Sequence, residues 1–306
     1  MHILEEAFRA RGKLMEFFIA QVLNGLSLGS IYVLLVTGFN LMLLVAKIIQ
    51  FAYPQFVVIS MYATWAVLRA TNNVILAILV TIVVSIFLNL LSEPIFRRIT
   101  SIKGTDINAT FVASIGLSMV LVEIMSHSLN QGFPISFSDN WVGGSVFRYG
   151  IINISRSSIF AWVGGIIVVV AFFYLLYRTM VGRLFRAIAE NRHVAKLFGI
   201  PIFKTSMMSY LIAGLLGGFI ALLLSMLIGT ASPWLGESVA LKVLAVSIVA
   251  GLGNLKGGLF VGLALGVVES VAIGYVAGSW SNVIAFVIML IVILAKPKGL
   301  FGAAVE

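Results

Sequence analysis

Long uncharged apolar segments alternate with short charged ones along almost the whole chain. A helix of roughly 20 apolar residues crosses about 30 Å of hydrocarbon, and these segments approach or exceed that length. We expect helices rather than barrel strands, because the runs are unbroken and lipid cannot satisfy open backbone groups. The predicted spans are residues 17–46, 48–68, 70–92, 107–130, 157–177, 205–230, 238–255, 257–277 and 279–295.

Residues 238–255 fit two interpretations, a full crossing or a half-spanning, re-entrant segment. The pattern therefore predicts an all-α polytopic membrane protein with eight or nine transmembrane helices. Segments that contain Gly or Pro are expected to be broken or re-entrant, because irregular backbone is tolerated in a membrane only inside protein or beside a cavity. Residues 1–16 are interpreted as an N-terminal extension, and residues 17–306 as one transmembrane domain.

The composition narrows the classes of protein further. Of the 306 residues, 61% are hydrophobic and only 10% are charged. A soluble domain carries roughly 25% charged residues, so a water-soluble globular protein, a disordered chain and a nucleic-acid-binding domain are excluded. The chain contains no cysteine, which excludes disulfides, thiol catalysis and cysteine metal sites.

The net charge of +9 is distributed unevenly across the predicted membrane. With nine crossings, thirteen Lys and Arg residues fall in loops on one side, and Arg69, Arg148 and Arg156 fall on the other. An excess of Lys and Arg marks the cytoplasmic side. We therefore expect residues 93–106, residues 178–204 and the C-terminus inside, and the start of the first span outside.

The cytoplasmic segment 178–204 is rich in Lys and Arg. Its apolar spacing predicts one short amphipathic helix, with Arg186 and Glu190 paired at i, i+4, and Gly199 supplies the helix stop. The shared apolar face is expected to contain Leu184, Ile188, Ala195 and Phe198. Two interpretations are open: a membrane-surface helix with its basic residues at the lipid headgroups, or a helix that docks into a groove of a cytoplasmic partner.

Polar side chains inside the predicted spans are candidates for a translocation path. Asn24, Ser27 and Ser30 recur at intervals of three on the first span, and Glu269 lies in a Gly-rich late span. A charged group at that depth by default indicates function, but hydrogen bonding between packed helices is the alternative for all four. A ridge for close helix packing is also predicted, formed by Gly258, Gly262 and Gly266.

The sequence lacks the motifs of a catalytic or nucleotide-binding site. The glycine-rich stretch 251–258 is not a phosphate loop, since no G-K-[ST] occurs in the chain. His2, His127 and His193 are too dispersed for a metal site. We expect no enzyme activity, metal or bound cofactor, which leaves two transport hypotheses: a passive subunit driven by partners, or a stand-alone channel or secondary carrier for a small polar solute.

Four stretches, taken in order, carry a family resemblance. They are FIAQVLNGLSLGSIYVLLVTGFNLML at 18–43, GRLFRAIAENRHVAKLFGI at 182–200, GLGNLKGGLFVGLALGVVES at 251–270 and KPKGLFG at 296–302. Together they resemble the permease subunits of branched-chain amino acid ABC importers, the inner-membrane translocators of amino acid, amide and urea import. The order and spacing match along nearly the whole chain from Met15.

The resemblance implies a transmembrane permease of an ATP-driven, binding-protein-dependent importer, for branched-chain or other amino acids, that works by alternating access. It implies four partners in the bacterial inner membrane complex: a second homologous permease, two ATP-binding-cassette subunits that use the ATP, and a periplasmic substrate-binding protein. The helix at 183–198 would then be the ATPase contact. Its implied coupling residues are Arg183, Leu184, Arg186, Ile188, Glu190, Arg192, Phe198 and Gly199.

The chain departs from the family pattern between the first two spans. Relatives commonly have N-F-A-H-G-E there, whereas residues 50–55 read QFAYPQ, so no titrating side chain is expected at this place. Pro54 would break or kink a helix, and the segment is expected to be non-helical backbone lining a cavity. The expected translocation path is made of Asn24, Ser27, Ser30, Gln50, Tyr53, Gln55 and Glu269.

Overall fold

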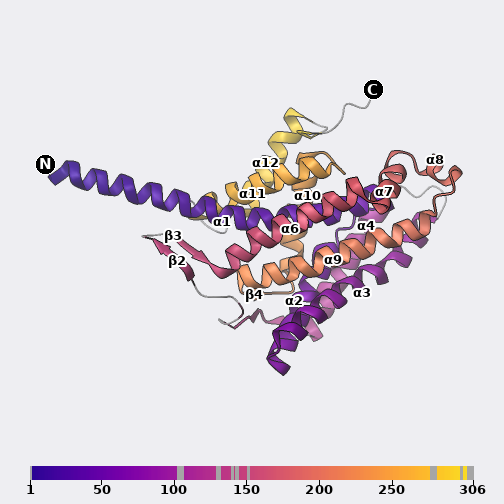
Figure 1. Ribbon diagram of the computed structural model, residues 1–306, viewed down its shortest axis with the longest axis horizontal. Coiled ribbons are helices and arrows are strands. Elements are labelled where there is room, and N and C mark those ends of the chain that lie inside the picture. The colour runs from indigo at the N-terminus through magenta and orange to yellow at the C-terminus, as the bar shows by residue number, and fades with distance from the viewer. Residues whose placement is uncertain are drawn as a thin grey trace.

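The computed structural model describes residues 2–101, 107–128, 132–138, 141, 145–149, 152–275, 281–296 and 299–301. Its helices form an elongated bundle, from which the start of α1 projects at one end (Figure 1). The first helices are α1 (His2–Ala46), α2 (Tyr53–Thr71), α3 (Val74–Ser101), α4 (Ile107–Ser128) and α6 (Arg156–Arg178). They are followed by α7 (Met180–Glu190), α8 (Arg192–Leu197), α9 (Ile202–Ile228), α10 (Leu235–Ala250), α11 (Leu255–Tyr275) and α12 (Ser281–Ala295).

Six helices in the described part of the chain are long and apolar enough to cross a membrane: α1, α3, α4, α6, α9 and α11. Helix α2 has 19 residues, α10 has 16 and α12 has 15, so α10 and α12 are shorter than the roughly 20 residues of an untilted span. The polytopic, almost wholly helical fold that the hydrophobic pattern predicts is therefore confirmed.

The few strands lie outside the helical bundle core. They are β1 (Ile135–Ser136), β2 (Ser145–Tyr149), β3 (Ile152–Ser155) and β4 (Thr230–Ala231). β1 pairs antiparallel with β4, and β2 with β3. The indole of Trp141, close to β1 in sequence, donates a hydrogen bond of 2.9 Å to Ser225 Oγ on α9, so this loop is fastened to the end of that helix.

Helices α1 and α11 pack against each other along most of the length of α11. A Cβ on Gly25 would lie 2.5 Å from Val267 Cα, and one on Gly266 would overlap the backbone of Gly29. Small residues thus let the two backbones touch, which is a common way for helices to associate in lipid. The predicted glycine ridge is confirmed, and its partner surface is the first span.

Helices α3 and α9 form a second close contact of the same kind. A Cβ on Gly214 would lie 2.7 Å from Ile86 Cα, and one on Gly218 would lie 2.8 Å from Ile82 Cα. Helix α2 joins them, since Thr64 Oγ1 and Thr81 Oγ1 lie 2.5 Å apart. The bundle therefore contains two glycine-dependent helix pairs, α1–α11 and α3–α9.

A non-helical break separates α1 from α2. Lys47 ends α1 with φ of 60°, and Ser114 Oγ on α4 donates to Ile49 O and accepts from Phe51 N. Pro54 lies in the first turn of α2, where its missing N–H costs nothing and its fixed φ suits a helix. The expected break is present at residues 47–52, but the prediction that residues 53–55 are non-helical is wrong, because α2 begins at Tyr53. The prediction that Pro54 breaks or kinks a helix is also wrong, because Pro54 lies where α2 starts.

Helix α3 also differs from its predicted end at residue 92. It continues through Glu93 and Pro94 to Ser101. Glu93 is buried, and its carboxylate lies 3.5 Å from Arg97 Nε one turn later. The hydrophobic pattern predicted that the helix ends before the charged Glu93. Because Arg97 compensates this charge within the same helix, α3 continues past it.

The glycine contact of α1 and α11 generates the first prediction. We expect Gly266→Ala to destabilise the protein, because the new Cβ has no space against Gly29 and the two helices must separate. Overpacking a tight contact costs about 1–3 kcal/mol. Thermal unfolding of the purified chain in detergent measures the effect.

Gly116→Ala on α4 is the matched control, because a Cβ there meets nothing within 4 Å. Alanine is the better helix former, so this variant should melt at or above the wild-type temperature. Equal melting temperatures for the two variants would contradict the packing role of Gly266.

Candidate functional site

The segment between α6 and α9 folds as two helices, α7 and α8. They are separated at Asn191, whose side-chain oxygen accepts hydrogen bonds from His193 N and Val194 N at 3.0 and 3.1 Å. Asparagine is a strong N-cap because its oxygen satisfies the free N–H groups of a first turn. The prediction of one continuous helix over 183–198 is therefore wrong: Asn191 starts a new one.

The break changes which residues share a face. Ile188 and Ala195 are buried in the protein core, whereas Leu184 is only half-buried and Phe198 is exposed. The predicted common face of these four residues is wrong, because a helix period cannot be carried across a capped break. Gly199 has φ of 78° and ends α8 as predicted, since glycine adopts this conformation readily.

Apolar side chains at and just after the end of helix α8 are exposed on the surface of the protein. Phe198 is 83% exposed and Leu197 75% exposed, and Val194 lies beside them. We call these three residues the α8 patch. Sequence reasoning missed Val194 and Leu197 because the single-helix prediction placed them off the apolar face.

Basic residues of α8 surround the α8 patch. Arg192, His193 and Lys196 are all exposed, and with Ile202 they line an open depression. Glu190, at the end of α7, is also exposed. An apolar centre with a charged rim is typical of a protein interaction surface.

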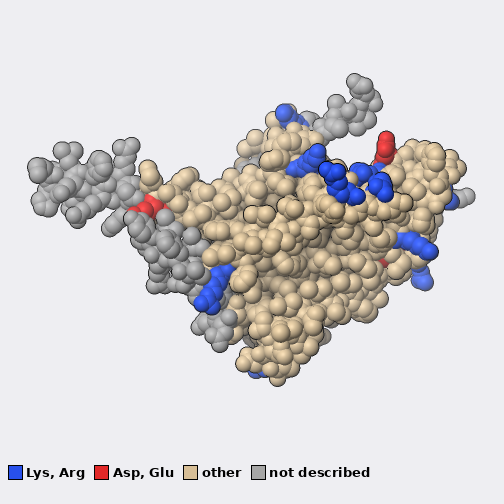
Figure 2. Space-filling model, viewed as in Figure 1, with Lys and Arg blue, Asp and Glu red and all other residues tan. Residues whose placement is uncertain are grey.

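Helix α7 is attached to the membrane-spanning helices through Arg186. Its guanidinium donates to the carbonyl oxygen of Leu176 on α6 and lies 5.4 Å from the centre of the Tyr177 ring. Arg186 therefore turns back toward α6 rather than pairing with Glu190 along the helix. Arg183 is exposed, and Lys and Arg side chains gather near α7 on the face shown in Figure 2.

Near this end of the bundle, one contact joins α7 to the end of α1, another joins α3 to α9, and a cavity lies beside α8. Lys47, after α1, donates to Ala189 O on α7 at 3.3 Å. Arg97 of α3 lies 4.4 Å from the ring centre of Phe203 on α9. A cavity of about 220 Å³ between these ends is lined by Arg192 together with residues of α3 and α9. A movement of α7 and α8 would therefore act on α1 through Lys47 and on α9, against which both helices pack.

The first-span candidates are dispersed over different surroundings. Asn24 is exposed, Ser30 is half-buried and Ser27 is fully buried. The two serine hydroxyls donate to carbonyl oxygens of their own helix, Leu23 O and Leu26 O. These contacts are typical of interhelical packing positions, and they do not bring the three residues to one shared cavity.

The second group lies at the start of α2 and is fully buried. Gln50 donates to Ser92 Oγ at 3.0 Å, Tyr53 to Ala213 O at 3.1 Å and Gln55 to Pro233 O at 3.0 Å. The side-chain oxygens of Gln50 and Gln55 have no hydrogen-bond partner among the described residues. Buried acceptors are normally satisfied, so this segment holds unused polar capacity in the interior.

Glu269 is paired inside the protein. Its two carboxylate oxygens accept from Lys242 Nζ of α10 at 2.5 Å and from Tyr32 Oη of α1 at 2.7 Å. The side chains of Lys242 and Glu269 are 12% and 4% exposed. The pair ties α10 to α11 and α1, and its formal charges cancel.

The buried ion pair generates the second prediction. We expect Glu269→Gln and Lys242→Met each to lower the unfolding temperature strongly, because each leaves a buried charge without its partner. Breaking such a pair costs about 3–5 kcal/mol. The double variant leaves no charge and should recover much of the loss in thermal unfolding in detergent.

Glu123→Gln is the control, because Glu123 is largely exposed on α4 and its ion pair with His127 is on the surface. Surface pairs contribute about 0–1 kcal/mol, so this variant should unfold like the wild type. Additive losses in the Lys242 and Glu269 double variant would show that the two charges are not coupled.

Comparison with known proteins places this sequence in a family. The family model for the permease component of branched-chain amino acid transport systems matches residues 21–293. No solved structure matches the chain.

The similarity to related proteins covers nearly the full chain. The high-affinity branched-chain amino acid transport system permease protein LivH of Salmonella typhimurium is 24% identical over 299 residues, which cover 94% of this chain and 96% of that protein. The permease protein BraD of Pseudomonas aeruginosa is 25% identical over 295 residues, with 93% and 96% covered. A probable LivH of Methanocaldococcus jannaschii is 24% identical over 293 residues, with 89% of each covered. The chain belongs to the family of permease components of branched-chain amino acid transport systems.

Proposed function

We propose that this permease moves branched-chain or chemically similar amino acids inward through a bacterial inner membrane, by alternating access, in an ATP-driven and binding-protein-dependent importer. The observation that carries the proposal is the α8 patch, an exposed apolar surface next to Arg192 and Lys196 in a permease of this family. In the printed names of its relatives the transport system is one for branched-chain amino acids. The proposed complex contains this chain, a second homologous permease, two ATP-binding-cassette subunits and a periplasmic substrate-binding protein.

We propose nine membrane crossings, with the N-terminus outside and the C-terminus in the cytoplasm. The end of α9 pairs through β4 with β1, and α10 ends at Gly251, beside Gly299 after α12. The non-helical residues 229–234 and the short α10 would together make the seventh crossing. The positive-inside rule supports this orientation, because eleven of the eighteen described Lys and Arg residues lie on α7, on α8 or at the proposed inner ends of the other helices.

We propose that the energy enters through α7 and α8, and that ATP is bound and hydrolysed by the partner subunits. The α8 patch would seat in a groove of an ATP-binding-cassette subunit, with Arg183, Arg192 and Glu190 at its rim. The half-buried Leu184 and buried Ile188 would hold α7 on the spans, and Arg186 would couple α7 to α6. Movement of the docked helices would then reach α1 through Lys47 and α9 through its packing against α7 and α8, and would pass from α9 to α3 through Phe203 and Arg97.

We propose that the start of α2 is the part of this chain nearest the substrate path. Gln50 and Gln55 hold buried amide oxygens with spare hydrogen-bonding capacity, and the Glu269–Lys242 pair adds no net charge to the interior. A neutral polar lining suits a zwitterion, whose own two charges cancel, better than a lining with an unpaired charge. Asn24, Ser27 and Ser30 would support the same path as packing positions on α1.

The docking proposal generates the third prediction. We expect the double variant Leu197→Ser, Phe198→Ser to lose binding of the ATPase subunits and substrate-stimulated ATP hydrolysis, because both side chains are exposed and available to a partner. Interface anchors contribute at least about 2 kcal/mol each, so the affinity should fall by more than about tenfold. Co-purification and ATPase activity of the reconstituted complex measure the loss.

Ile75→Ser is the matched control, because Ile75 is 71% exposed near the start of α3, at the opposite end of that helix from Arg97. It should leave ATPase binding unchanged. Normal co-purification of the Leu197 and Phe198 variant would overturn the docking proposal. Uptake by the purified chain without ATPase subunits would instead favour a stand-alone channel or carrier.

The path proposal generates the fourth prediction. We expect Gln55→Leu, which removes a buried amide of similar size, to lower uptake by about tenfold if one substrate hydrogen bond worth about 1.5 kcal/mol is lost. ATPase binding should be retained. Ser118→Ala is the control, since Ser118 is also buried without a described partner but lies on α4. Equal uptake by both variants would contradict a path beside Gln55.

A further inference from the structure

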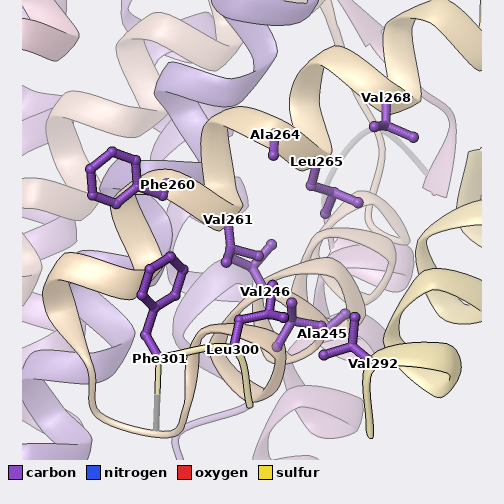
Figure 3. A pocket seen from close by; sticks show the side chains of 11 residues that line it. Ala245, Val246, Phe260, Val261, Ala264, Leu265, Val268, Val292, Leu300 and Phe301 are labelled. Atoms are coloured by element: carbon purple, nitrogen blue, oxygen red, sulfur yellow. The ribbon is translucent and has the colours of Figure 1, made fainter. Parts of the chain in front are cut away.

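A wholly apolar cavity lies between α10, α11, α12 and the C-terminal residues 299–301. Its volume is about 270 Å³. Figure 3 shows side chains from these separate elements pointing into one common space. Its lining includes Val246 of α10, Ala264 and Leu265 of α11, Val292 of α12, and Leu300 and Phe301.

Two cations converge just beyond one end of this cavity. Phe260 stacks on Phe301, with ring centres 6.0 Å apart, and Lys256 lies one helical turn before Phe260 on α11. Lys256 Nζ lies 5.5 Å from the centre of the Tyr177 ring, and the Arg186 guanidinium lies 5.4 Å from the same ring. Lys256 and Phe260 are both exposed, so a basic surface passes directly into an apolar one.

In the part of the chain that the structure describes, no carboxylate pairs with this basic surface. The ion pairs found within the described residues join Arg97 to Glu93, His127 to Glu123 and Lys242 to Glu269, and none includes Lys256 or Arg186. Both cations lie at the Tyr177 ring, and Arg186, which also donates to Leu176 O, has further N–H groups. Such a pair favours a phosphate group, which accepts charge-assisted hydrogen bonds.

We propose that this surface binds an anionic phospholipid. The phosphate lies between Lys256 and Arg186 at the Tyr177 ring, and one acyl chain enters the apolar cavity past Phe260. An acyl chain needs no hydrogen bonds, whereas a peptide segment would bring backbone groups that the nonpolar lining cannot satisfy. Basic groups at the cytoplasmic surface of a membrane attract anionic headgroups in the same way. The proposal does not depend on the transport function.

Native mass spectrometry of the full chain in detergent tests the site with three probes. Dioleoyl-phosphatidylglycerol carries both the anionic phosphate and the chains, dioleoyl-phosphatidylcholine has the same chains with a zwitterionic headgroup, and glycerol phosphate has no chain. We expect phosphatidylglycerol to bind at least about fivefold more tightly than phosphatidylcholine. Glycerol phosphate should not bind measurably, because the apolar cavity would stay unfilled.

Two variants test the two halves of the site. Lys256→Gln should weaken phosphatidylglycerol about fivefold and leave phosphatidylcholine unchanged, and its control is Lys204→Gln, at an exposed lysine on α9. Ala264→Phe should fill the cavity and weaken both lipids. Its control is Ala171→Phe, at an exposed alanine on α6 outside the cavity lining.

The outcomes separate the possible occupants. Equal binding of the two lipids, or phosphatidylglycerol binding that survives both Lys256→Gln and Ala264→Phe, would overturn the proposal. Tight binding of glycerol phosphate would show an anion site without a lipid. Loss of bound phosphatidylglycerol when the importer complex is assembled would show that a partner subunit covers the surface, and would also overturn it.

Discussion

Direct backbone contact between α1 and α11 is the constraint on which the remaining structure depends. Gly29 and Gly266 allow the two helices to touch, and this approach brings Tyr32 within 2.7 Å of Glu269. Lys242 then completes the ion pair from α10. Bulkier residues at the glycine positions would separate the helices and remove the hydrogen bond that Tyr32 donates to the buried carboxylate of Glu269, and burying a charged group with fewer hydrogen bonds is costly. The close packing of α1 against α11 therefore also helps to stabilise the buried carboxylate of Glu269.

The same arrangement explains how the membrane-spanning helices of a permease can contain charged residues. Glu269, Lys242 and Glu93 all have charged partners on the protein itself, so the interior is close to electrically neutral. In the proposed importer, the energy is supplied by the partner ATP-binding-cassette subunits. The side with α7 and α8 is suited to receive it, because the exposed α8 patch belongs to a segment that contacts the end of α1 through Lys47 and packs against α6 and α9.

The sequence predicted the structure best where a residue type favours one local structure whatever its surroundings. Uncharged runs predicted the helices, glycines at four-residue intervals predicted a packing ridge, and Gly199 predicted the end of a helix. It was wrong where a local contact overrides the average pattern. Asn191 caps a new helix inside a region with continuous helical spacing, and Arg97 compensates Glu93 so that α3 continues past its predicted end. Neither contact can be recognised from hydrophobicity alone.

The sequence by itself determined the membrane class, most of the spans and the family, because hydrophobic length and glycine spacing are properties of a local stretch of chain. Only the tertiary structure decided which polar residues are used up in internal contacts and which are available. Glu269 pairs with Lys242, 27 residues away, and with Tyr32, 237 residues away. Leu197 and Phe198 are exposed because Asn191 reorients α8. Such outcomes depend on which faces meet in space, and the spacing of residues along one helix does not contain that information.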